Sequence, residues 1–217
     1  MKQVSRRSSR AIPSSVVALA GAVLLWLCGC AAPPVPVMDE MLTKPRYLRY
    51  TLRGQQAGLY TETWRSNYLS FPAVYKIGSK IEFPMYSESQ IDMAVDGLPA
   101  KMFTRDVKFP TTQDGMRQFL DKHFATTPEE LNLEAVDAQA KNGIDSGNAA
   151  VNMSKEQVLM AIGYPSHIDD YVIAGDLPRQ RILGSNQWIY RWSEFGPFTT
   201  YHVYQFNSEG KLANVIR

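Results

Sequence analysis

The chain has 217 residues, and a composition of 45% apolar and 20% charged residues is typical of a globular protein and argues against an intrinsically disordered one. Four of its 23 basic residues and none of its 21 acidic residues precede residue 30, so residues 30–217 hold 19 basic and 21 acidic residues, a net charge of −2. That balance lacks the concentrated basic surface of a nucleic-acid-binding protein. The cysteines are Cys28 and Cys30, so the chain beyond them has no thiol for a disulfide, a metal site or a nucleophile.

Residues 1–29 have the features of a bacterial export signal. Basic residues between Lys2 and Arg10 precede an apolar run over residues 15–27, which is shorter than the ~20 residues of a membrane span and typical of a signal peptide. The sequence Leu27-Cys28-Gly29-Cys30 then resembles the bacterial lipoprotein box, in which an aliphatic residue and two small residues precede the modified cysteine. The resemblance implies cleavage before Cys30 and attachment of a diacylglycerol and an N-acyl chain (palmitate) to Cys30, with no other cofactor. An ordinary secretory peptide and an uncleaved anchor are the alternatives.

Residues 30–45 are predicted to form a tether between the lipidated cysteine and the folded part. Three prolines between Ala31 and Val37 favour an extended, semi-rigid spacer. In the lipoprotein pattern an aspartate after the modified cysteine favours the inner membrane, and this chain has Ala31 there. The resemblance therefore implies the periplasmic face of the outer membrane.

Residues 46–141 are predicted to form a small β-rich domain, barrel- or sandwich-like, that ends in two helices. Five short segments alternate between apolar and polar residues and are separated by turns such as Asp96-Gly97. The segments are residues 47–52, 59–64, 73–77, 80–83 and 91–95. Helical spacing of apolar residues predicts a helix near 113–125, and the sequence from Thr127 to Glu130 predicts the start of a second one. Residues 141–148 indicate an interdomain linker.

Residues 148–217 are predicted to form a second domain, so the expected fold class is α+β. Ser154 and Gln157 have the spacing of a capping box, and Gly163 predicts the end of that helix. Three strands follow and predict an antiparallel meander. They cover residues 187–192, 200–206 and 211–216.

The order of these motifs resembles the SmpA/OmlA (BamE-like) family. The matching segments are residues 153–158, Gly163-Tyr164-Pro165, Trp188-Ile189-Tyr190 and residues 206–212. Members are small periplasm-facing outer-membrane lipoproteins with a helix–helix–sheet fold, and the founding members are accessory subunits of the β-barrel assembly machinery. Asn152 replaces the usual glycine, residues 166–185 form a longer connection, and residues 46–140 have no counterpart in the short subunits. The resemblance implies a role in outer-membrane protein assembly or envelope integrity.

Five aromatic residues of the predicted meander are candidate binding residues, because alternation along each strand places its members on one sheet face. They are Trp188, Tyr190, Trp192, Tyr204 and Phe206. One short helix cannot cover both faces of a three-stranded sheet. The aromatic face therefore either binds a protein partner or packs against the rest of the chain.

The sequence shows no catalytic or metal-binding pattern. His123, His167 and His202 are too far apart for a local pair of metal ligands, and the helical position of His123 indicates a structural role. Ser166-His167 with Asp169 and Asp170 offers the residue types of a catalytic triad, but residues so close in sequence rarely converge on one substrate. We interpret that segment as a solvated turn.

The sequence thus predicts a non-enzymatic, lipid-anchored envelope lipoprotein that binds an envelope protein and no nucleic acid. One alternative is a cell-wall module that binds peptidoglycan, because the strand spacing of the first domain loosely resembles that of Src-homology-3-like barrels. A minor alternative is an envelope hydrolase.

Overall fold

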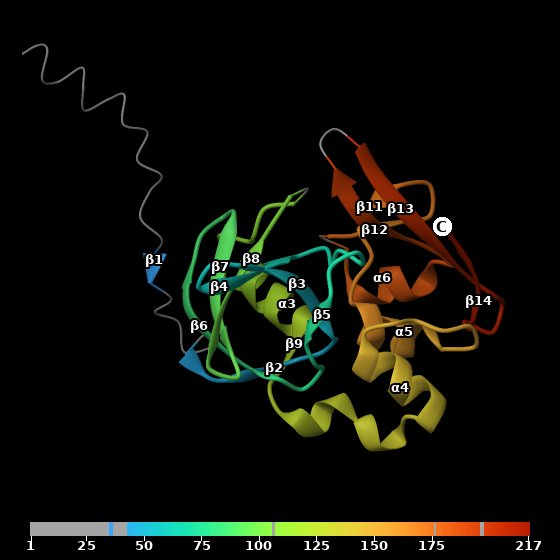
Figure 1. Cartoon of the computed structure of the whole chain (residues 1–217), viewed down its shortest axis with the longest axis horizontal. Helices are drawn as coiled ribbons and strands as arrows, with labels where there is room; N and C mark the ends of the chain where they lie inside the picture. The colour runs from blue at the N-terminus through green and yellow to red at the C-terminus, as the bar shows by residue number, and fades with distance from the viewer. Residues whose placement is uncertain (1–34, 37–42, 106, 176, 196–197) are drawn as a thin grey trace, which may run out of the picture. The chain divides into compact units, whose positions relative to one another are not determined.

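The structure is a computed structural model that describes residues 35–36, 43–105, 107–175, 177–195 and 198–217, all within one compact unit. The fold is α+β and β-rich, as predicted, with two sheets and a few helices (Figure 1). The first sheet is curled and contains β1 (Val35–Pro36), β2 (Arg46–Leu48), β3 (Leu52–Ala57), β4 (Tyr60–Trp64), β5 (Ala73–Tyr75), β6 (Lys80–Tyr86), β7 (Gln90–Val95), β8 (Leu98–Phe103) and β9 (Phe124–Ala125). The second contains β10 (His167–Ile168), β11 (Val172–Ile173), β12 (Gln187–Phe195), β13 (Phe198–Phe206) and β14 (Leu212–Ile216).

The first sheet has the strand order β5-β3-β4-β8-β7-β6-β2-β9, with β1 added at β6. Its neighbours pair antiparallel except β4 and β8, which are parallel. The predicted Asp96-Gly97 hairpin is confirmed, because both residues have the positive φ angles (49° and 81°) that a tight β7–β8 turn requires. The strand expected over residues 47–52 is divided into the end of β2 and the start of β3, and β8 and β9 are strands that were not predicted.

The predicted tether is partly bound to this sheet, because Val35 and Pro36 pair with Tyr86 and Met85 of β6. The signal peptide and Cys30 lie outside the described residues. None of the helices in the described ranges has the length and apolar character to cross a membrane.

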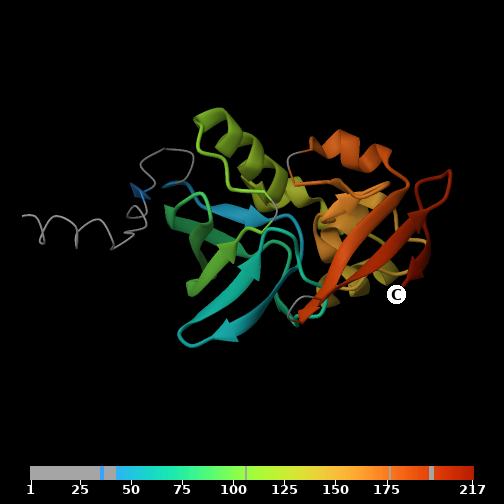
Figure 2. The same cartoon turned by 90° about the horizontal axis from the view of Figure 1, so that it is seen from above.

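Helix α3 (Gln113–His123) confirms the helix predicted near 113–125. It begins at Thr112, whose side chain accepts a hydrogen bond from the amide of Gly115, and it buries Met116, Phe119 and Leu120. The helix continues directly into β9, which pairs with β2, so α3 is held along one side of the curled sheet (Figure 2). The core of the first sheet is therefore closed by this helix.

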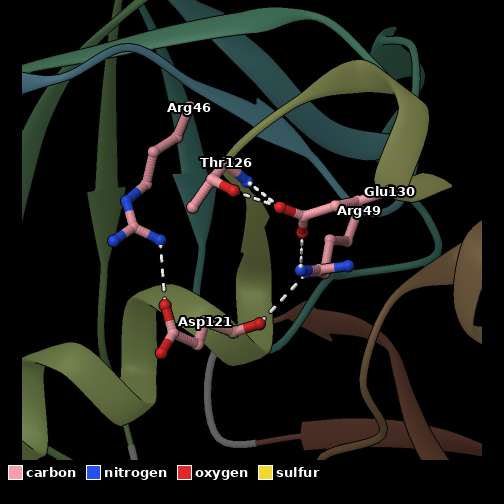
Figure 3. A network of polar contacts seen from close by, with 5 residues as sticks. All are labelled: Arg46, Arg49, Asp121, Thr126 and Glu130. Atoms are coloured by element: carbon pink, nitrogen blue, oxygen red, sulfur yellow. Dashed lines mark hydrogen bonds and ion pairs between the residues drawn. The ribbon is translucent and has the colours of Figure 1, made fainter.

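Arginines from the β2 region fix the end of α3 to the chain that follows it (Figure 3). Arg46 pairs with the carboxylate of Asp121 at 3.1 Å, and Arg49 donates to the Asp121 carbonyl at 3.1 Å. Arg49 also pairs with Glu130 at 2.6 Å, and Glu130 accepts hydrogen bonds from the amide and hydroxyl of Thr126. The polar contacts thus join residues 46–49 to the end of α3 and to the segment after it, more than 70 residues further along the chain.

The segment after α3 differs from its prediction. Instead of one α-helix it forms two short 3₁₀ turns, η1 (Pro128–Leu131) and η2 (Leu133–Ala135), because Asn132 between them adopts a left-handed conformation. The expected linker over residues 141–148 was wrong, since α4 (Ala138–Ser146) occupies most of it. Asp137 caps this helix by accepting from the amide of Ala140, and this short-range signal favours a helix there.

Helix α5 (Lys155–Ile162) confirms the predicted capping box, in which Ser154 accepts from the Gln157 amide and the Gln157 side chain accepts from the Ser154 amide. Gly163, with a φ of 74°, ends the helix as predicted. The second sheet has the order β11-β10-β12-β13-β14, so the predicted three-strand meander is present. Residues 166–185 add β10 and β11 to this sheet and also contain helix α6 (Arg179–Gly184).

Buried polar side chains join β3 and the loop after β4 to the α4–α5 pair. Asn67 donates to the carbonyls of Thr51 and Ile162 at 3.0 and 2.9 Å. The hydroxyl of Thr51 donates to the Ile144 carbonyl at 2.6 Å. Apolar residues from both sheets belong to one core cluster, so residues 46–141 and 148–217 pack together.

Candidate functional site

Four of the five candidate aromatic residues lie in the core. Trp188 and Tyr190 on β12 pack edge to face against Phe206 and Tyr204 on β13, with ring centroids 4.5 and 5.0 Å apart, and all four side chains are buried. The reason is that two segments cover this face. The indole of Trp188 donates to the Ile182 carbonyl in α6, and the Tyr190 hydroxyl donates to the carbonyl of Gly163 after α5. The rings of these four residues therefore pack inside the chain, which is the second of the two alternatives that the sequence left open, and they do not form an exposed docking surface.

Trp192 is the accessible member of the five, with 40% of its surface exposed. The β12–β13 register shifts between Arg191 and Ser193, so Trp192 lies at a β-bulge. Its ring stacks on His202, with centroids 4.4 Å apart and planes inclined by 14°. The exposed indole of Trp192 thus covers the buried imidazole of His202.

His123 has the structural position that its helical spacing predicted. It is buried, and its Nδ1 lies 3.0 Å from the Tyr50 hydroxyl. Burial lowers the pKa of His123 well below its usual value, and the charges of Lys122 and Arg65 lower it further. The neutral imidazole is therefore part of the core.

The segment around His167 is not solvated as expected, because Ser166 and His167 are both buried. The Ser166 hydroxyl donates to the Ile189 carbonyl at 2.9 Å and lies 3.0 Å from Nδ1 of His167. The carboxylate of Asp169 instead accepts a hydrogen bond from Ser185. The hydroxyl of Ser166 is thus engaged with a backbone carbonyl, and the Asp169 carboxylate is engaged with Ser185. Within the described part of the chain, no three His, Cys, Asp or Glu side chains gather as metal ligands.

A groove of about 780 Å³ lies between α3 and the segment that leads into α6. Two cations in its wall bind backbone carbonyls. Arg65 donates to Val107, Lys108 and Gly175 at 2.8–3.1 Å, and Lys122 donates to Ala174, Gly175 and Leu177 at 3.0–3.2 Å. These cations fasten the segment before α6 to the first sheet and its helix.

The edge strand β11 carries exposed apolar residues that the sequence analysis did not single out. Tyr171, Val172 and Ile173 are 59%, 44% and 45% exposed. Asp169 and Tyr171, in the turn before the strand, have φ angles of 45° and 64°, a conformation that costs energy for residues other than glycine. The tyrosine ring packs against His167 and Tyr201 with centroids 5.7 and 5.9 Å away.

Among the strands that the structure describes, β11 pairs on one side only, with β10. An extended chain can add to such an edge through backbone hydrogen bonds, while exposed apolar side chains supply contact area. The three consecutive apolar residues 171–173 were the sequence signal for this surface. We call Tyr171, Val172 and Ile173 the β11 edge.

Comparison of the chain with protein-family models, with curated proteins and with solved structures finds no match.

Proposed function

We propose that this protein is a lipid-anchored lipoprotein of the outer membrane's periplasmic face that binds an envelope protein without catalysing a reaction. The observation that carries the proposal is the sequence Leu27-Cys28-Gly29-Cys30 after a basic and then apolar leader. Acyl chains on Cys30 would anchor the protein, since each buried CH₂ contributes about 0.8 kcal/mol and several chains together bind a bilayer stably.

The arrangement of the second half supports the proposed BamE-like domain. Helix α4 ends at Ser146, just before the predicted domain of residues 148–217, and packs against α5 within it; the antiparallel strands β12, β13 and β14 follow. This is the helix–helix–sheet order that the resemblance implies. The additional elements β10, β11 and α6 fall in the connection that is longer than in compact members. The role in outer-membrane protein assembly is part of this proposal.

The β11 edge supports binding of a protein partner. It combines three consecutive exposed apolar side chains with a strand edge, and both features are typical of surfaces that add a partner strand. In our proposal the partner contributes an extended segment beside Val172, and the Tyr171 ring packs against its side chains.

The anchor is tested by incorporation of labelled palmitate. We expect Cys30→Ala to abolish labelling and to leave an unprocessed precursor. Cys28→Ala is the matched control, because alanine is also small and leaves the modified cysteine in place, so labelling persists. Equal labelling of Cys30→Ala and the wild-type protein would contradict the anchor.

The partner surface is tested by a photo-crosslinking residue at Val172 in intact cells. We expect a discrete product with an envelope protein, and its loss when Tyr171 is also replaced by alanine. The same probe at Leu59, which is more exposed but lies on the first sheet, is the control. If Leu59 and not Val172 gives the product, the β11 edge is not the binding surface. Sedimentation of the purified protein with sacculi, without a crosslinked protein, would support the cell-wall alternative instead.

A further inference from the structure

A polar cavity of about 460 Å³ lies where β3, the α4–α5 connection and the face of β12 and β13 meet. It is separate from the β11 edge and from the groove beside α3. Its polar and aromatic lining residues are Arg53, Asn148, Trp192, His202, Tyr204 and Arg217. Among the described residues that line the cavity there is no acidic side chain. The charged side chains among its lining residues, Arg53 and Arg217, are therefore both cationic.

Arg53 places a buried charge at this cavity without a carboxylate partner. Its side chain donates to the carbonyls of Phe71 and Gly147 and to the side-chain oxygen of Asn148, all of which are neutral acceptors. Burial lowers the pKa of Arg53, which reflects the cost of removing its charge from water. A charge in such surroundings interacts strongly with a nearby anion, because water does not screen it.

Three further groups at the cavity have hydrogen-bonding capacity that no described residue uses. These are the hydroxyl of Tyr204, the imidazole of His202 and the guanidinium of Arg217. Burial raises the pKa of Tyr204 to about 12, so its hydroxyl keeps its proton and remains a donor. Burial and, after it, the charge of Arg217 lower the pKa of His202, and the same charge partly offsets the effect of burial on the pKa of Tyr204. The hydrogen-bond donors of Tyr204, His202 and Arg217 therefore lie close to one another at the cavity.

The cavity also has a flat apolar wall. The indole of Trp192 stacks on His202 with centroids 4.4 Å apart, and 40% of Trp192 is exposed. An aromatic or aliphatic group can lie against such a surface while a polar group reaches deeper donors. The volume exceeds what a bare inorganic anion needs, and it falls in the range of small-molecule sites.

We propose that this cavity binds a small organic oxyanion, whose carboxylate or phosphate group accepts hydrogen bonds from Tyr204, His202 and Arg217 beside the charge of Arg53. The body of the ligand packs against Trp192. Binding at this cavity does not depend on the lipid anchor or on the β11 edge, so a negative result in the test below would leave the proposed function unaffected.

The test is a titration of the purified lipidated protein in non-ionic detergent, followed by Trp fluorescence and calorimetry. The probes are benzoate and phenyl phosphate, and benzamide is the neutral analogue of the same shape. We expect saturable binding of at least one anion and at least tenfold weaker binding of benzamide, because charge-assisted hydrogen bonds are stronger than neutral ones. Tighter binding of benzoate identifies a carboxylate ligand, and tighter binding of phenyl phosphate identifies a phosphate ligand.

Two variants locate the site. Arg217→Gln removes an exposed charge, and Tyr204→Phe removes one hydroxyl while keeping the ring, so both are expected to fold and to weaken anion binding about tenfold. Lys108→Gln is the control, since it removes an exposed cation elsewhere and should leave affinity unchanged. The proposal is overturned if neither anion saturates, if benzamide binds as well as benzoate, or if both cavity variants bind like the wild-type protein.

Discussion

The hydroxyl of Tyr50 lies 3.0 Å from Nδ1 of His123 inside the hydrophobic core. The imidazole also packs against the rings of Phe119 and Tyr164, with centroids 4.6 and 5.1 Å away. Its other nitrogen, Nε2, has no hydrogen-bond partner among the described residues. The core therefore accommodates the imidazole of His123 only in its neutral form.

This burial predicts that the protein loses stability as the pH falls below about 6.5, the ordinary pKa of histidine. The folded state keeps His123 neutral because its pKa is lowered, whereas the unfolded chain takes up a proton. One such group contributes at most about 1.4 kcal/mol per pH unit to the decrease in the free energy of unfolding. Denaturant titrations between pH 7.5 and 5 should show this slope.

The slope should become smaller in His123→Gln, because the titrating group is gone. Tyr50→Phe is the matched control, since it removes the hydrogen bond and lowers stability at every pH but leaves the buried histidine and its slope. An identical pH dependence in His123→Gln and the wild-type protein would show that another group is responsible.

Gly163→Ala should destabilise the protein for two reasons. Its φ of 74° disfavours alanine, and the added Cβ would lie 2.8 Å from the Tyr50 ring. Gly210→Ala isolates the backbone effect, because Gly210 has a φ of 71° and no atom within 4 Å of an added Cβ. We expect a loss of about 1 kcal/mol for Gly210→Ala and about 2–4 kcal/mol for Gly163→Ala in thermal or denaturant unfolding. Equal losses would mean that Tyr50 moves aside without cost.

Trp188→Ala should cost about 3–5 kcal/mol, because the side chain is fully buried and its indole donates to the Ile182 carbonyl at 2.9 Å. Trp192→Ala removes the same side chain from the same strand at a partly exposed position and should cost much less. The comparison of the two melting temperatures checks the assignment of Trp188 to the core and Trp192 to the surface.

Asn67→Asp should destabilise the protein by about 3 kcal/mol at neutral pH, although it changes a single atom. The Asn67 amide donates to the carbonyls of Thr51 and Ile162, and an aspartate would direct an unpaired oxygen at one or both of them. The loss should become smaller as the pH falls towards 4, because burial beside two carbonyl oxygens raises the pKa of the aspartate and its protonated form can donate again. Asn142→Asp, on an exposed part of α4, is the control and should stay within about 0.5 kcal/mol of the wild-type protein.

The features predicted correctly depend on residues close together in the sequence. The capping box of Ser154 and Gln157, the Asp96-Gly97 turn and the strands β12 and β13 are each specified by a short run of residues. The linker prediction was wrong because its glycines outweighed the cap at Asp137, and α4 gains its stability by burying Ala140 and Ile144. Packing against distant segments cannot be read from such local signals.

The candidate binding residues also separate into what local sequence signals predict and what packing against distant segments decides. The alternation of Trp188 and Tyr190 predicted a shared sheet face, but the sequence does not show that α5 and α6 cover it. The cavity around Arg53 was not predicted either, because it brings together residues from β3, the α4–α5 connection and β13. In contrast, residues 171–173 formed a visible apolar run that the sequence analysis passed over.

The hydrogen bonds from Arg53 to Gly147 and from Asn67 to Ile162 span 94 and 95 residues. A fragment that stops near residue 145 would keep these two donors but lose their acceptors, and the seam beside β3 would be open to water. During synthesis the first half therefore leaves the ribosome before it can complete its own interior. The hydrogen bonds of Arg53 and Asn67 can be completed only after α5 has been synthesised.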